Sequence, residues 1–212
     1  MKNLLLIAYL DLKESIRANW FIVYSLVFGG LIALFFIAGI TESQVMGFSG
    51  LSRLLLMYIQ VTIVILPIFI LITTVRSISG DRDSHILEYM LSFPISLKQY
   101  YWGKVFGRFI TVFLPVFMAM VFAIVYGIFK GADVPWSIFF LYTGLLFAMS
   151  SAFLGIAFFI SSIVKSSEMA LGISFFIWIF LLAFIDIALT SLMMQQRIDT
   201  EIIIGIAMIN PR

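Results

Sequence analysis

Five long apolar runs dominate the chain, and a charged segment, residues 76–108, separates the second run from the third. The runs cover residues 21–40, 54–75, 109–129, 136–164 and 169–192. Each reaches the roughly 20 residues that a helix needs to cross a hydrocarbon core of about 30 Å. The pattern predicts an all-α fold: a polytopic membrane helix bundle with a single transmembrane domain over residues 21–212.

Composition leads to the same class of protein. Hydrophobic residues make up 63% of the chain and charged residues 11%, and the mean hydropathy is +1.15. So few polar side chains cannot solvate the surface of a globule of this length. The chain has no Cys, which excludes disulfides and thiolate metal sites formed by these residues.

Residues 1–20 show a helical amphipathic pattern. One face carries apolar side chains and the other charged ones: Leu5, Tyr9, Leu12 and Ile16 against Asp11, Lys13, Glu14 and Arg17. The pattern indicates an interfacial helix lying on the cytoplasmic leaflet. A cytoplasmic extension of the first span is the alternative.

Basic residues predict the orientation. With the amino terminus inside, nine lie in the inner segments: Lys2, Lys13, Arg17, Arg76, Arg82, Lys98, Lys104, Arg108 and Lys165. Three lie in the outer segments: Arg53, Lys130 and Arg197. This asymmetry favours a cytoplasmic amino terminus.

The first half of segment 76–108 predicts a short exposed helix. Residues 79–83 are expected to form a polar turn that leaves the second span, and Asp83 or Ser84 is expected to cap a helix beginning near His85. That helix has a small apolar stripe and stops at Pro94; the stripe consists of Ile86, Leu87, Met90 and Leu91. A helix this short and apolar needs a partner surface.

The second half predicts a rigid connection to the membrane. Ser96 and Gln99 have the spacing of a capping box, so a helix should start at Leu97 and run unbroken into the third span. Force on the short helix would then move the span. A solvated loop with incidental helix is the alternative.

Four pieces of this segment resemble the cytoplasmic signature of the ABC-2 permeases, the membrane subunits of type V ATP-binding-cassette exporters. They are Gly80-Asp81-Arg82-Asp83, the stretch 87–94, Ser96 and Gly103-Lys104. His85-Ile86 stands where Gly-Thr is usual. The resemblance implies a homodimer and two cytoplasmic ATPase subunits that bind ATP and magnesium. It also implies that the ATPase is contacted by Asp81, Asp83, His85, Ile86, Leu87, Glu88, Met90, Leu91 and Pro94.

Further residues, scattered along the chain, resemble the corresponding residues of the permeases of the Nos systems, which serve maturation of nitrous oxide reductase. They are residues 45–49, Trp178, residues 184–186 and Asn210-Pro211. This resemblance implies the bacterial inner membrane, a periplasmic accessory protein and a role in copper-sulfur site maturation. The family has six spans, so the sixth is expected to follow Arg212.

The chain has no catalytic set of its own. Gly103-Lys104 is followed by Val105, and position 98 is Lys, so the Gly-Lys pair does not belong to a phosphate-binding loop. One His and no Cys leave no ordinary zinc site. We expect no cofactor on this chain and no nucleic-acid partner.

A few residues inside the apolar runs are candidates for function. Asp186 is either a functional carboxylate or one hydrated near the outer interface, and Gln60 is a candidate for interhelical hydrogen bonding. Pro67 and Pro115 are candidate hinges. A path for copper is a further possibility, because thioether sulfur is a soft ligand suited to Cu(I). Its candidate ligands are Met118, Met120, Met193 and Met194.

Three functions remain to be separated. In the first, which the resemblance implies, the chain would be a permease subunit that exports or delivers a cargo, for copper-sulfur site maturation or for another ABC-2 substrate. Alternatively, it is a mechanical transmitter that relays ATP-driven motion to a periplasmic protein. An intramembrane enzyme is disfavoured, because Asp186 has no second acid, His or nucleophile at usable spacing.

Overall fold

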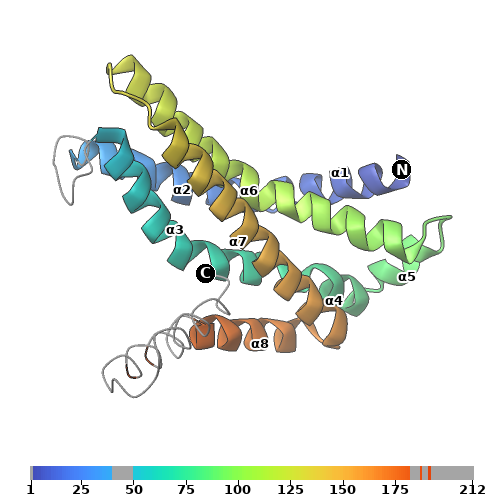
Figure 1. The fold of residues 1–212 in the computed structure, drawn as a ribbon. Coiled ribbons are helices and arrows are strands. Elements are labelled where there is room, and N and C mark those ends of the chain that lie inside the picture. The colour runs from blue at the N-terminus through green and yellow to red at the C-terminus, as the bar shows by residue number, and fades with distance from the viewer. Residues whose placement is uncertain (1, 40–49, 182–186, 188–190, 192–212) are drawn as a thin grey trace.

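The structure is a computed structural model that describes residues 2–39, 50–181, 187 and 191 (Figure 1). The elements of this part are α1 (Lys2–Arg17), α2 (Trp20–Ile37), α3 (Gly50–Thr74), α4 (Arg76–Asp83), α5 (Ile86–Leu91), α6 (Leu97–Phe129), α7 (Trp136–Ile163) and α8 (Ser167–Ile179). The predicted all-α membrane bundle is confirmed.

Four of the five apolar runs coincide with long helices. Helices α2, α6 and α7, and α3 together with α4, are long and apolar enough to cross a membrane. Helix α8 begins the fifth run, and most of that run beyond residue 181 lies outside the described residues. The long helices lie alongside one another, whereas α4 and α5 lie at one end of the molecule, called here the α5 end (Figure 1).

The core lies between α2, α3, α6 and α7. Tyr24 of α2 is fully buried, and its hydroxyl shares a hydrogen bond of 2.9 Å with the Thr73 hydroxyl of α3. The hydroxyl of Tyr58 donates to the carbonyl of Val116 on α6 at 3.2 Å. These two tyrosine hydroxyls therefore have partners, as burial in an apolar interior favours.

Three residues singled out inside the spans are positioned as follows. Pro67 and Pro115 are buried inside α3 and α6, and both helices continue past them. Gln60 lies on α3 with its side chain exposed at the surface of the chain. The hinge role of the two prolines and the functional role of Gln60 stay predictions.

Helix α1 packs closely along α6. A Cβ added to Gly103 would lie 2.7 Å from the Ile7 Cβ, and one added to Gly107 would lie 2.8 Å from the Ala8 carbonyl oxygen. The apolar stripe predicted for the membrane surface points away from α6, since Leu5 and Tyr9 are exposed. This arrangement suits an interfacial helix.

Asn19 separates α1 from α2. Its φ of 62° is a left-handed conformation, which a helix does not continue through. The alternative that residues 1–20 extend the first span as one helix is therefore wrong.

The polar turn predicted at residues 79–83 is also wrong, because these residues belong to α4. Helix α4 has no side-chain cap at its own start. Instead, the Ser161 hydroxyl of α7 accepts hydrogen bonds from the backbone N–H groups of Ile78 and Ser79, each at 3.0 Å. A distant residue thus satisfies amides that would otherwise lack partners.

Replacing Gly107 by Ala is expected to lower the free energy of unfolding by about 1–3 kcal/mol, because the methyl group would force the α1 backbone away from α6. Protease cleavage within α1 should increase in parallel. Equilibrium unfolding in mixed micelles measures the first effect and limited proteolysis the second.

Gly144→Ala is the matched control. Gly144 lies in α7 with nothing within 4 Å of an added Cβ, so Ala there should be neutral or stabilise the helix by up to about 1 kcal/mol. Equal stability of Gly107→Ala and the unmodified chain would contradict the close contact of α1 and α6.

Candidate functional site at the α5 end

Helix α5 exposes an apolar surface. Its start is His85, which is left-handed with φ 58° and makes no side-chain cap, so the capping role predicted for Asp83 or Ser84 is wrong. No residue of α5 is buried. Ile86 is 47% exposed, Tyr89 65% and Phe93 46%. The short exposed helix predicted from the sequence is confirmed, and much of its apolar surface is exposed.

The predicted stripe on α5 is only partly exposed. Leu91 and Pro94 are exposed, whereas Leu87 and Met90 are half-buried. Tyr89 and Phe93, which the stripe omitted, contact each other edge to face, with 5.3 Å between ring centroids. His85 and Glu88 form an exposed ion pair of 3.7 Å, and such a pair adds little stability.

Helix α6 begins directly after this corner. Ser96 accepts a hydrogen bond from the Gln99 backbone N–H, and the Gln99 side chain accepts one from the Ser96 backbone N–H. The capping box predicted from the sequence is therefore confirmed. From Leu97 the helix runs unbroken to Phe129, so the corner at α5 and a membrane span share one rigid element.

The two aspartates of α4 face the protein. Asp81 is buried, accepts a hydrogen bond from the Tyr100 hydroxyl and pairs with the ammonium group of Lys104. Asp83 accepts hydrogen bonds from the backbone N–H and the hydroxyl of Ser167, at 2.9 and 2.8 Å. Asp83 therefore binds the first residue of α8, whose N-cap is Ser166, and Asp81 joins α4 to α6.

Arg82 joins α4 to the end of α7. Its guanidinium donates to the carbonyl oxygens of Val164 and Ser162, at 3.3 and 3.1 Å. These carbonyls belong to a helix end, which carries partial negative charge. Together with the contacts of Ser161 and Asp83, the two hydrogen bonds of Arg82 connect α4 to α7 and α8.

Asp11 belongs to a buried ion cluster that the sequence did not predict. It was expected on the solvated face of α1, and that expectation is wrong, because it is only 2% exposed. One carboxylate oxygen lies 3.2 Å from Arg108 Nε, and the other lies 3.9 Å from Lys104 Nζ. Burial raises the pKa of Asp11 above its ordinary value, while Arg108 and Lys104 oppose that rise.

Lys104 connects three helices. Besides Asp11 of α1 and Asp81 of α4, it donates to the Ser77 carbonyl of α4 at 3.0 Å. A signal for this cluster exists in the sequence: Lys104 and Arg108 are four residues apart on α6, next to Gly103 and Gly107. Small residues let another backbone approach, so the two cations lie where a close neighbour can supply a carboxylate.

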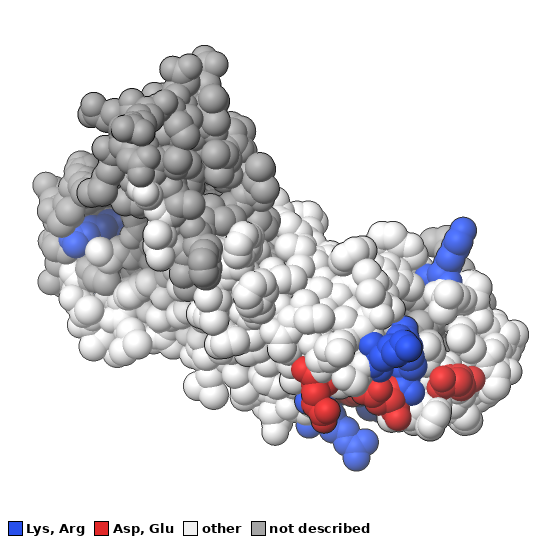
Figure 2. Space-filling view, turned by 90° about the horizontal axis from the view of Figure 1, so that it is seen from below, with Lys and Arg blue, Asp and Glu red and all other residues white. Residues whose placement is uncertain are grey.

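Charged side chains gather at this end of the molecule. Figure 2 shows acidic and basic groups together over the α5 end, while the middle of the same face is uncharged. Asp186, the candidate acid of the fifth run, lies outside the described residues, and its role stays a prediction.

Known proteins resemble this chain over most of its length. A family model described as ABC-2 family transporter protein matches residues 5–211. A probable ABC transporter permease protein NosY from Stutzerimonas stutzeri is 21% identical over 211 residues, which cover 97% of this chain and 76% of the relative. The protein of the same name from Pseudomonas aeruginosa is also 21% identical, with 97% and 77% covered.

Proposed function

Since the chain belongs to the ABC-2 family of transporter proteins, we propose that it is the membrane permease subunit of an ATP-binding-cassette transporter and that α5 docks a separate ATPase. The observation that carries the proposal is the exposed apolar face of α5, on a helix too short to be stable alone. A partner surface covers that face.

The connections around α5 suit the transmission of motion. On one side α5 follows α4, which is bonded to α6, α7 and α8 through Lys104, Ser161 and Ser167. On the other side it leads into α6, a single helix that includes a span. Movement of α5 by ATP-driven closure of the ATPase would therefore reach α6, α7 and α8 together.

The α5 end is the cytoplasmic end in this proposal. Basic residues of α1, α4 and the start of α6 lie there, in agreement with the positive-inside rule. The amino terminus is then cytoplasmic, in a bacterial inner membrane. Two copies of the chain pair with two ATPase subunits, which bind ATP and magnesium and supply the catalysis.

The names of the relatives support a specific process. Both are NosY permeases, and we extend to this chain the export or periplasmic delivery that serves copper-sulfur site maturation of nitrous oxide reductase, together with a periplasmic accessory protein. A mechanical transmitter is the second candidate. It is favoured by α2 and α7, which contain no Asp, Glu, Lys or Arg and would form a closed apolar interface.

A photo-crosslinking amino acid at position 89 tests the docking. We expect an adduct whose peptides come from a protein with a phosphate-binding loop, because Tyr89 is exposed on α5. The same amino acid at position 129 is the control, since Phe129 is 84% exposed but lies at the far end of α6. Equal adducts at both positions, or none at 89, would contradict the proposal.

A further inference from the structure

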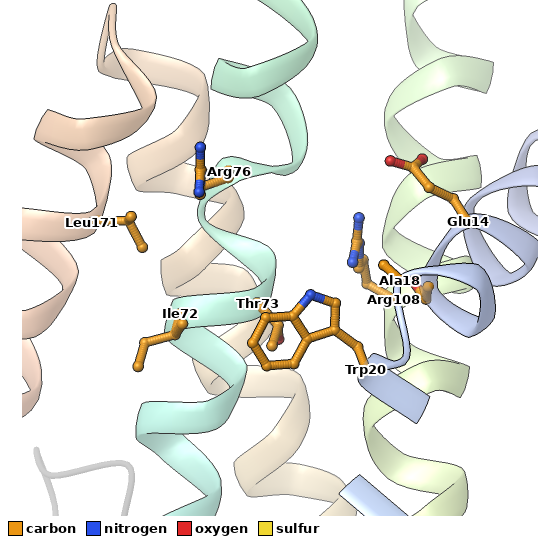
Figure 3. A pocket seen from close by; sticks show the side chains of 9 residues that line it. Glu14, Ala18, Trp20, Ile72, Thr73, Arg76, Arg108 and Leu171 are labelled. Carbon is orange, nitrogen blue, oxygen red and sulfur yellow. The ribbon is translucent and has the colours of Figure 1, made fainter. Parts of the chain in front are cut away.

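A cavity of about 220 Å³ lies beside the ion cluster, between the α1–α2 connection, the α3–α4 junction and α8 (Figure 3). Its wall includes Arg76, Arg108 and Glu14, together with the indole of Trp20. The proposed docking of the ATPase does not use it. The cavity is open to the surface at the level where the spans begin.

Three of its lining residues are buried and polar: Arg108, Ser15 and Thr73. Of these, Thr73 is hydrogen-bonded to Tyr24 and to the Phe69 carbonyl. Arg108 is 8% exposed and Ser15 is 1% exposed. The Nε atom of Arg108 faces Asp11, and no hydrogen bond joins its two terminal nitrogens to another residue in the described ranges. The Ser15 hydroxyl likewise has no hydrogen-bond partner there. Donors of this kind are satisfied by water or by a ligand that accepts hydrogen bonds.

The start of α2 adds to the preference for an anion. Asn19 provides no side-chain cap, so the first backbone N–H groups of this 18-residue helix are uncapped, next to Trp20 in the cavity wall. A helix start carries partial positive charge and binds phosphate readily.

The charges around the cavity limit the ligand further. Arg108 is neutralised by Asp11, which leaves the cation of Arg76 and the carboxylate of Glu14. Figure 3 shows these two side chains on opposite sides of the rim, with Trp20 between and below them. A pocket with one cation and one carboxylate matches a ligand with both a phosphate and an ammonium group.

Part of the wall is apolar, beside the polar Thr73. Ile72 and Leu171 line the cavity, and Ile72 lies on α3 inside the membrane-spanning run. A ligand with a charged head and a hydrocarbon tail fits this division, and interfacial Trp side chains lie at the same depth as lipid head groups.

We propose that this cavity binds one membrane phospholipid with an ethanolamine head group. The phosphate lies against Arg108, Ser15 and Arg76, the ammonium group faces Glu14, and the acyl chains run along Ile72. The lipid fills the space between the α1–α2 connection and α3, beside the ion cluster.

Native mass spectrometry of the full chain, purified in mild detergent, tests this proposal. Phosphatidylethanolamine and phosphatidylglycerol are titrated separately. We expect one phosphatidylethanolamine to bind about tenfold more tightly than phosphatidylglycerol, and Arg76→Gln to weaken its binding about tenfold. Glu14→Gln should remove the preference by weakening phosphatidylethanolamine alone.

Both variants replace exposed side chains, so the fold is expected to survive. Arg17→Gln is the control, because Arg17 is exposed on α1 and does not line the cavity. Tighter or equal binding of phosphatidylglycerol would overturn the proposal, and so would equal effects of Arg76→Gln and Arg17→Gln. Soluble phosphoethanolamine must compete weakly; competition as strong as that of the lipid would show a site for a free phosphate ester instead.

Discussion

Replacing Tyr89 by Asp is expected to lower the affinity of the chain for its ATPase by about thirtyfold or more, the effect of removing an interface hot spot. Tyr89 is the most exposed large side chain of α5. A carboxylate there would be buried against the partner without a compensating charge, and its desolvation costs free energy. Co-purification of the ATPase with the tagged chain, followed by titration of the purified subunits, measures the loss.

Tyr89→Phe is the matched control, because it keeps the ring and removes only the hydroxyl. It should retain most of the binding, and both variants should reach the membrane in equal amounts. Asp at Leu87 or Met90 is also expected to release the ATPase, but these side chains are half-buried, so such variants would disturb α5 itself. Full binding by Tyr89→Asp would show that α5 is not the docking surface.

Lys104→Met is expected to lower the free energy of unfolding by about 3–5 kcal/mol, the usual cost of removing one member of a buried ion pair. The side chain of Met fills a similar volume, so lost packing contributes little. The loss comes from Asp81, which would keep a buried charge without its cation, and from Asp11, which would keep only Arg108. Equilibrium unfolding in mixed micelles measures the change.

Two further variants identify the cause of that loss. Lys98→Met removes a cation from an exposed position at the start of the same helix and should change the stability by less than about 0.5 kcal/mol. Adding Asp81→Leu to Lys104→Met should recover part of the loss, because the unpaired charge is removed with its partner. A double variant less stable than Lys104→Met would show that the pair does not control the stability.

The contrast between α5 and α4 shows which parts of the site could be predicted. The capping box of Ser96 and Gln99 could be predicted from the sequence, because its hydrogen bonds join residues three apart. The exposed apolar helix before it could be predicted from its short apolar stripe and from Pro94, which ends it. Helix α4 was missed because the hydroxyl that satisfies its first amides belongs to Ser161, more than eighty residues along the chain.

The sequence by itself determined four of the five predicted spans, the start of α6 and the presence of a short apolar helix, because run length and capping depend on near neighbours. Only the tertiary structure decided that Asp11 leaves the solvated face of α1 to meet Lys104 and Arg108, that Asp83 binds the first residue of α8, and that Arg76 and Glu14 border one cavity. Each of these arrangements brings together side chains from distant segments, and a charge pattern does not say which groups a charged side chain will meet. For Asp11 the deciding contact is the close approach of α1 to α6 at Gly103 and Gly107, since burial there excludes water from its carboxylate and makes the neighbouring cations its partners.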